Sequence, residues 1–221
     1  MMPFLPPAPP VVSKMFSAIQ AEGGLAGTPA VFLVSIDGPP RPVWCRQPRA
    51  ESDVQAATLG GILSAVRRFW SDYAVITGGE PLRLDGMADF CAKLREFEHH
   101  VTVETSGAIF VENFPCDLMS VNIRLGAPAS SKKKSAPFPA FDIAAVRQIV
   151  EHYPHQLKFY CEDSAAEWNE IKRIAAEVNV KRSNVFLLPT ASKGKNLAAQ
   201  LEWIEELSRV QGYRFAPRLS E

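Results

Sequence analysis

The regular alternation of β-branched runs with helical patterns is the feature that most constrains the fold of this chain. Short apolar runs typical of buried strands alternate with longer stretches whose apolar residues recur at helical spacing. Strands separated by helical stretches of about ten residues or more indicate a mostly parallel sheet with helices outside it. We expect about six such strands, at 31–36, 73–77, 100–105, 118–124, 156–161 and 185–188. We expect helices at 54–70, 87–97, 141–152, 165–178 and 197–210.

Length and composition favour a single domain. The chain has 221 residues, 47% of them hydrophobic, and no apolar run near the ~18 residues of a bilayer span. Residues 1–13 are rich in proline, so we expect a disordered tail there, with a proline-recognition ligand as the alternative. Residues 14–221 then form one α/β domain, either an open sheet or an incomplete (β/α) barrel.

The charge balance limits the expected classes of binding partner, and the cysteines indicate the cellular compartment. The chain has 24 Lys and Arg against 24 Asp and Glu, so no net charge attracts nucleic acid or a membrane surface, and we expect neither partner. The four cysteines have no short mutual spacing, and the N-terminal segment lacks the order of a signal peptide. These features predict a cytoplasmic protein with free thiols.

Polar and glycine-containing segments follow the ends of successive predicted strands. Because the carboxyl ends of parallel strands meet at one edge of a sheet, we expect these segments to line a common rim. They are residues 38–47, 78–81, 105–107, 122–124 and 158–161.

Seven short segments, taken together, match one known family in order and approximate spacing. They are Phe16–Gly23, Gly27–Phe32, Thr77–Pro81, Glu104–Gly107, Ser120–Asn122, Gln156–Phe159 and Tyr213–Leu219. From about Lys14 to Leu219, the chain resembles the 7-carboxy-7-deazaguanine synthase family of radical S-adenosylmethionine enzymes. The resemblance implies a radical-SAM-like incomplete barrel, and an unrelated parallel α/β domain is the alternative.

The resemblance also implies a specific chemistry. The family contracts 6-carboxy-5,6,7,8-tetrahydropterin to 7-carboxy-7-deazaguanine on the way to queuosine and other 7-deazapurines. Three cysteines in a loop after the first strand ordinarily hold a [4Fe–4S] cluster, whose fourth iron takes S-adenosylmethionine. Family members often form homodimers, so a homodimer is also implied.

The loop after the first strand departs from the family pattern. Its single cysteine, Cys45, resembles the last of the three cluster ligands, and the first two are missing. Cys91 lies in a predicted helix and Cys116 precedes a predicted strand, so only Cys161 is expected on the same rim. We therefore expect no conventional [4Fe–4S] cluster, with Cys45 at most a remnant metal ligand.

A magnesium ion is also not expected. The family usually follows the third cysteine with Asp-Thr, whose hydroxyl helps to hold Mg²⁺. Arg46 and Gln47 stand there instead, and a cation beside a neutral amide serves a hard divalent ion poorly.

The resemblance assigns one group of residues to S-adenosylmethionine. These cofactor-binding residues are Gly78, Gly79, Glu80, Thr105 and Ser106. Glycines let the backbone approach a ligand closely, and Glu80 can accept a hydrogen bond from the methionyl ammonium. The alternative is a glycine turn that only ends a strand, with Glu80 in solvent.

A second group is implied for a pterin or 7-deazaguanine ligand. The residues are Gln20, Glu22, Gly23, Lys158 and Arg218. An amide and a carboxylate at 20 and 22 can read the donor and acceptor edge of a pyrimidinone ring. Lys158 and Arg218 can pair with a substrate carboxylate, and pairing of Lys158 with Glu104 across neighbouring strands is the alternative.

Two functional classes follow. The favoured one is a degenerate family member, a pseudoenzyme that keeps a pocket for S-adenosylmethionine, a pterin or a deazaguanine and serves as a regulator or a partner of a catalytic protein. The other is an active carbon–nitrogen lyase of the 7-carboxy-7-deazaguanine synthase type with an atypical cluster at Cys45. A frame-shifted segment over residues 38–50 in an active lineage is a third reading.

Overall fold

A computed structural model describes residues 12–35, 52–53, 59–125, 141–161, 165–190 and 195–216. The strands are β1 (Val12–Ile19), β2 (Pro29–Ser35), β3 (Ser52–Asp53), β4 (Tyr73–Thr77), β5 (His100–Thr105), β6 (Leu118–Arg124), β7 (His155–Cys161), β8 (Val185–Pro189) and β9 (Arg214–Phe215). The α-helices are α1 (Leu59–Val66), α2 (Met87–Glu96), α3 (Ile143–His152), α4 (Ala165–Glu177) and α5 (Lys195–Gln211). Short 3₁₀ turns are η1 (Gly23–Leu25), η2 (Pro81–Arg83) and η3 (Arg182–Asn184).

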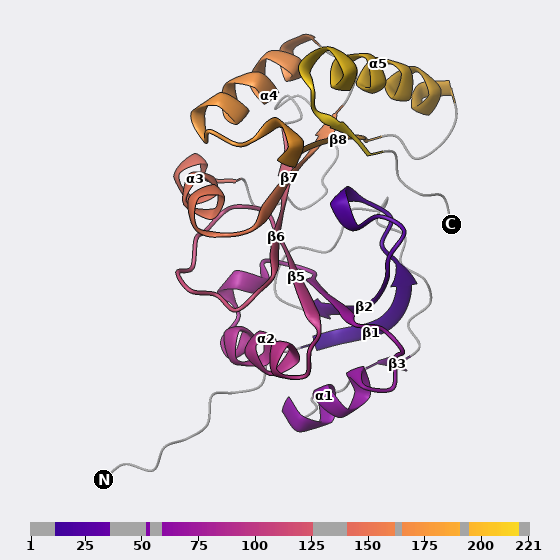
Figure 1. Cartoon of the computed structure of the whole chain (residues 1–221), viewed down its shortest axis with the longest axis vertical. Coiled ribbons are helices and arrows are strands. Elements are labelled where there is room, and N and C mark those ends of the chain that lie inside the picture. The colour runs from indigo at the N-terminus through magenta and orange to yellow at the C-terminus, as the bar shows by residue number, and fades with distance from the viewer. Residues whose placement is uncertain are drawn as a thin grey trace, which may run out of the picture.

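All strands of the described ranges join one curved sheet. Their order is β3-β1-β2-β4-β5-β6-β7-β8-β9. In this order, each strand from β2 through β4 to β9 is parallel to the next. β1 runs antiparallel to both of its neighbours, β3 and β2. Figure 1 shows the sheet curling with the helices outside it and η1 within the curve. The arrangement confirms the prediction of a mostly parallel sheet covered by helices.

The six predicted strands are all present, and the predicted bounds of β4, β5 and β6 are those observed. Three strands were not predicted, namely β1, β3 and β9. Because β1 begins at Val12, the domain starts two residues before the predicted boundary at Lys14, and residues 1–11 lie outside the described part.

The predicted helix at 54–70 is too long. Residues 54–58 lie outside the described part, and α1 ends at Val66, where tight backbone turns begin. Trp70, expected on the apolar stripe of this helix, is fully exposed.

Alternate residues of the central strands face opposite sides of the sheet. On β7, Leu157 and Phe159 belong to the core beneath the helices. Between and beside them, Gln156, Lys158 and Tyr160 make polar contacts on the concave side. A strand has a side-chain period of two, so one strand serves both the core and a polar surface.

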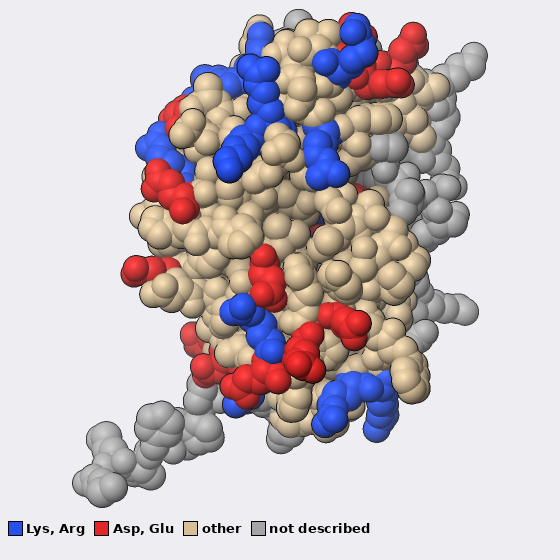
Figure 2. Space-filling view, in the orientation of Figure 1, with Lys and Arg blue, Asp and Glu red and all other residues tan. Residues whose placement is uncertain are grey.

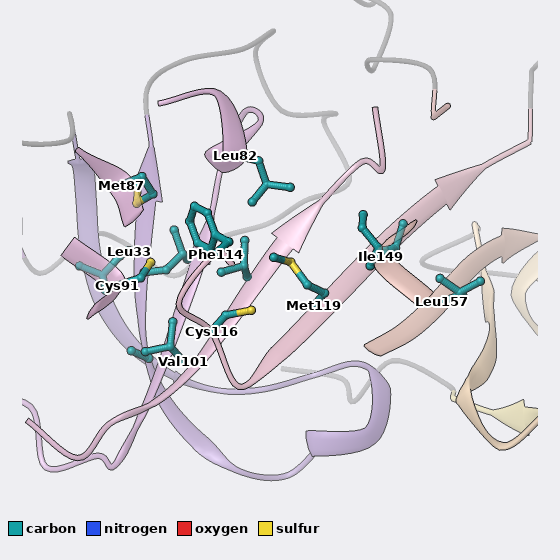
Figure 3. Close-up of a cluster of buried hydrophobic side chains, with 14 of the residues drawn as sticks. Leu33, Leu82, Met87, Cys91, Val101, Phe114, Cys116, Met119, Ile149 and Leu157 are labelled. Carbon is teal, nitrogen blue, oxygen red and sulfur yellow. The ribbon is translucent and has the colours of Figure 1, made fainter. Parts of the chain in front are cut away.

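The main core lies between the helices and the outer face of the sheet. Figure 3 shows aliphatic side chains there together with Cys91 and Cys116. Met119 and Ile149 in the same cluster have no exposed surface. Full burial of each such side chain contributes roughly 1.5–3 kcal/mol. The concave face is therefore not needed to supply the main core.

The surface carries both signs of charge. Figure 2 shows a group of Lys and Arg toward the end with α4 and α5 and a group of Asp and Glu toward α2, with some side chains of the opposite charge at each end. In the described part of the chain, no helix combines the length and the apolar character needed to cross a bilayer.

Candidate functional site

A chain of polar contacts crosses the concave face of the sheet. Thr77 Oγ1 donates to Glu104 Oε2 at 2.6 Å, and Lys158 Nζ donates to Glu104 Oε1 at 2.8 Å. Lys158 Nζ also lies 3.4 Å from Glu22 Oε2, which accepts a 2.7 Å hydrogen bond from the Tyr160 hydroxyl. These polar contacts join β4, β5 and β7 to the segment between β1 and β2.

One buried ammonium stands between two carboxylates in this chain. Lys158 is 1% exposed. Burial by itself lowers the pKa of Lys158, but the charges of Glu104, Tyr160 and Glu22 outweigh burial and hold the pKa above its ordinary value. Lys158 therefore stays charged and places one positive charge between two carboxylates.

The paired state of Lys158 argues against its predicted contact with a substrate carboxylate. The alternative pairing with Glu104 is the one observed, at 2.8 Å. The two strands are not neighbours, however, because β6 lies between β5 and β7. The long lysine side chain spans that strand, and Glu22 from a distant segment completes the pair.

Tyr160 links the same network to β6. Its hydroxyl lies 3.2 Å from Asn122 Oδ1, and the guanidinium carbon of Arg124 lies 4.7 Å from its ring centroid. Burial first, and then the charge of Glu22, raise the pKa of the Tyr160 hydroxyl. The phenol therefore remains a hydrogen-bond donor to Glu22.

The segment 20–28 between β1 and β2 brings Glu22 to the sheet. Its ends are closed by hydrogen bonds from Gln20 N to Thr28 O at 2.9 Å and from Gly27 N to Gln20 O at 2.8 Å. Gln20 is 7% exposed, and its side-chain Nε2 has no hydrogen-bond partner within the described ranges. A buried unpaired amide costs about 1–3 kcal/mol, so a ligand oxygen near Gln20 would be favoured.

Gly23 has a packing role next to this predicted ligand segment. Gly24 N donates to Gln156 Oε1 at 2.8 Å. A Cβ on Gly23 would lie 2.7 Å from both polar atoms of the Gln156 side chain, and the φ of Gly23 is +78°. The structure thus explains this glycine by the approach of Gln156, a residue that the sequence reasoning did not assign to the site.

The residues predicted to bind S-adenosylmethionine converge at the carboxyl ends of β4 and β5. Glu80 Oε1 accepts from Thr105 Oγ1 at 2.7 Å, and Glu80 Oε2 accepts from Ser106 N at 3.0 Å and Ser106 Oγ at 2.6 Å. Glu80 is 4% exposed, so the alternative of a solvated carboxylate is wrong. Its oxygens are already engaged, and a ligand ammonium would have to displace one of these donors.

Gly78 also has a structural explanation. A Cβ there would lie 2.5 Å from the backbone oxygen of Ser35 at the end of β2, and φ is +128°. Gly78 and Gly79 are both partly exposed. The backbone of this turn, more than the Glu80 side chain, is the part that a ligand can reach.

Three of the four cysteines lie in the core beneath the helices. Cys91, Cys116 and Cys161 are buried and free. Cys161, expected on the rim, is on the outer side of β7, where its Sγ lies 3.4 Å from Phe159 O. Burial raises the pKa of Cys116 and of Cys161 to about 12. These thiols are not placed or activated as ligands for a site on the concave face.

Two predicted site residues, Cys45 and Arg218, lie outside the described residues. Within the described ranges, no group of three or more His, Cys, Asp or Glu is arranged to hold a metal ion. A pocket of about 260 Å³ lies at the amino ends of the strands and is lined by Gly24, Leu25 and Gln156 among others. None of the predicted cofactor-binding residues lines it.

No protein-family model matches this sequence, whereas individual relatives do. A 7-carboxy-7-deazaguanine synthase from Halobacterium salinarum is 30% identical over 232 residues, which cover 96% of this chain and 89% of the relative. The chain belongs to the 7-carboxy-7-deazaguanine synthase family. A second synthase, from Rhodopirellula baltica, is 28% identical over 95% of this chain and 84% of its own length.

Solved structures show the same fold as this family member. QueE from Escherichia coli superposes with a TM-score of 0.70 at 17% identity, covering 96% of this chain and 94% of QueE. Streptococcus suis SuiB, in a structure bound to S-adenosylmethionine, gives a TM-score of 0.52 at 12% identity over 77% of this chain and 46% of SuiB. The predicted radical-SAM-like incomplete barrel is confirmed.

Proposed function

We propose that this 7-carboxy-7-deazaguanine synthase homologue binds S-adenosylmethionine, a pterin or a 7-deazaguanine but does not assemble the three-cysteine [4Fe–4S] cluster of its family. Its role is then that of a regulator or a partner of a catalytic protein. A cytoplasmic setting and a homodimer belong to the same proposal. The equal numbers of basic and acidic residues, 24 each, support small-molecule and protein partners over nucleic acid or membrane.

The placement of the cysteines carries this proposal. The chain has four cysteines, and three are buried beneath the helices. Only Cys45 is left for a cluster on the concave side, whereas such clusters are held by several thiolates. The residues of this chain therefore do not fit the family's cluster, and no reaction step is assigned to it.

The concave face supports a retained ligand site. Burying Lys158 between Glu22 and Glu104 carries a desolvation cost that a purely structural sheet can avoid with apolar residues. The unpaired Nε2 of buried Gln20 fits a ring carbonyl, and the Glu22 carboxylate fits a ring amino group. A pterin or a 7-deazaguanine presents both groups on one edge.

The rim turn supports S-adenosylmethionine binding through its backbone. Glu80, held by Thr105 and Ser106, fixes the turn, and the partly exposed Gly78 and Gly79 offer their backbone groups to the methionyl end. We assign the ligand carboxylate to Arg218, because Lys158 is already paired.

A second candidate function is an active carbon–nitrogen lyase with an atypical cluster that includes Cys45. The polar network from Thr77 to Glu22 favours this candidate. A network that fixes side-chain orientation lowers the reaction barrier when it holds a substrate in the reactive geometry.

Calorimetry separates the two halves of the proposed site. The full chain should bind S-adenosylmethionine and 6-carboxytetrahydropterin, and Gln20→Met should weaken the pterin about tenfold while leaving S-adenosylmethionine within about twofold. Cys45→Ser is the control and should bind both ligands as the native chain does. If neither ligand binds the native chain, the proposal fails. Formation of 5′-deoxyadenosine after iron and sulfide reconstitution would replace it with the second candidate.

A further inference from the structure

We propose that Gln156 is the positioning residue of the proposed ligand site, because it fixes the backbone of the segment that carries Gln20 and Glu22. This inference rests on the proposed function for the identity of the ligand. The placement of the segment itself can be tested without any ligand.

Both polar atoms of the Gln156 side chain form hydrogen bonds. Its Oε1 accepts from Gly24 N at 2.8 Å, and its Nε2 donates to Ser120 Oγ on β6 at 2.9 Å. The residue is 6% exposed. A buried amide with one bond to a loop and one to the neighbouring strand holds the loop in a fixed register against the sheet.

Gly23 shows how closely the loop and the side chain fit. The space that a Cβ on Gly23 would occupy is filled by the polar end of Gln156, at 2.7 Å from both terminal atoms. Only glycine lets the backbone approach so closely with φ at +78°. The loop conformation and Gln156 are therefore matched to each other.

The consequence falls on Glu22, the residue that precedes Gly23 in the chain. Gln156, Lys158 and Tyr160 alternate on β7 and face the same side of the sheet. Gln156 holds Gly24 by its backbone, while Lys158 and Tyr160 hold the Glu22 carboxylate. Gln156 thus sets where Glu22 meets its partners.

Three variants test this role in the full-length chain. Gln156→Met keeps the side-chain length and removes both hydrogen bonds. Gln156→Glu keeps an acceptor for Gly24 N, and the Ser120 hydroxyl can rotate to donate to the new carboxylate. Gln148→Met, an exposed glutamine on α3, is the matched control for the chemical change.

The first readout is backbone amide exchange without ligand. Gln156→Met should exchange at least about tenfold faster across residues 20–28 and normally in β4 and β5, whereas Gln156→Glu and Gln148→Met should match the native chain. Unchanged exchange at 20–28, or faster exchange throughout the molecule, would overturn the positioning role.

The second readout is calorimetry with 6-carboxytetrahydropterin and with S-adenosylmethionine. Gln156→Met should raise the Kd of the pterin about tenfold and change that of S-adenosylmethionine by less than about twofold, with recovery in Gln156→Glu. An equal loss for both ligands would contradict a role specific to this segment. If the native chain binds no pterin, the pterin half of the proposed function fails, and amide exchange alone decides the role of Gln156.

A double-mutant cycle supplies the last check. Gly23→Ala should accelerate exchange at 20–28 more in the native background than in Gln156→Ala, because the clash is with the Gln156 side chain. Additive effects in the two backgrounds would contradict the proposed fit.

Discussion

Single side chains decide what this site can offer a ligand. Glu80 and Lys158 are both buried and both fully engaged within the protein. Neither can bind a ligand ion without giving up a partner of its own. Among the described residues, the Gln20 amide and the backbone of the rim turn are suited to a ligand without losing a partner. Charge at Glu80 and Lys158 therefore orders the protein first.

The contribution of the buried network to the free energy of unfolding should become measurable at alkaline pH. Folding raises the pKa of Lys158 and of Tyr160 above their ordinary values of 10.5 and 10.0, so above about pH 10 the unfolded chain holds fewer protons than the folded chain. The stabilisation is fully present below that pH and is lost as pH rises. Tyr160→Phe should therefore reduce the slope of unfolding free energy between about pH 10.5 and 11.5 by up to ~1.4 kcal/mol per pH unit.

Urea unfolding at several alkaline pH values measures these slopes. Parallel curves for the native chain and Tyr160→Phe would show that the phenol does not hold its proton more tightly in the folded state.

Among the elements, β7 shows which parts of this structure the sequence could predict. Its position is predicted to within one residue from a mostly apolar run between two helical patterns, although the strand contains no β-branched residue. The two-residue strands β3 and β9 have no such signal, because they exist only by pairing with neighbours. β1 has no strict alternation of apolar and polar residues, because Ser13 and Lys14 are adjacent polar residues and Met15 and Phe16 adjacent apolar ones. Its last four residues were interpreted only as part of the family segment Phe16–Gly23.

The same distinction holds for the site. The meeting of Glu80 with Thr105 and Ser106 follows from the rule that parallel strands end at one rim. The contact of Glu22 with Lys158 could not be predicted in this way, because it depends on how the segment 20–28 folds into the sheet. Cys161 was placed on the rim but not on the correct face, since its side-chain direction depends on strand register.

The turn after β4 offers a test of packing against β2. Gly78→Ala should lower the unfolding free energy by about 2–4 kcal/mol, because it combines a strained φ with a clash against the Ser35 backbone. Gly27→Ala is the matched control, since its φ is +91° but its Cβ would meet nothing within 4 Å. It should cost only about 1–2 kcal/mol. Equal losses in urea unfolding would mean that Gly78 is explained by backbone conformation alone.

The whole molecule is an open barrel whose two surfaces have different compositions. The outer face and the helices hold the apolar core, including three of the four cysteines, and the concave face holds a buried charged network. The family fold and a candidate ligand site are thus kept, while the three cysteines among the described residues lie beneath the helices and not on the concave side. A binding protein built on an enzyme's scaffold is consistent with both observations.

Iron content after anaerobic reconstitution tests this conclusion most directly. The chain is incubated with iron, sulfide and reductant, desalted, and analysed for iron and sulfide per chain beside its Cys45→Ala variant. We predict substoichiometric iron that is the same in both proteins, without the EPR signal of a reduced cubane. About four irons and four sulfides per chain, lost in Cys45→Ala, would contradict the account, because that is the composition of a complete [4Fe–4S] cluster.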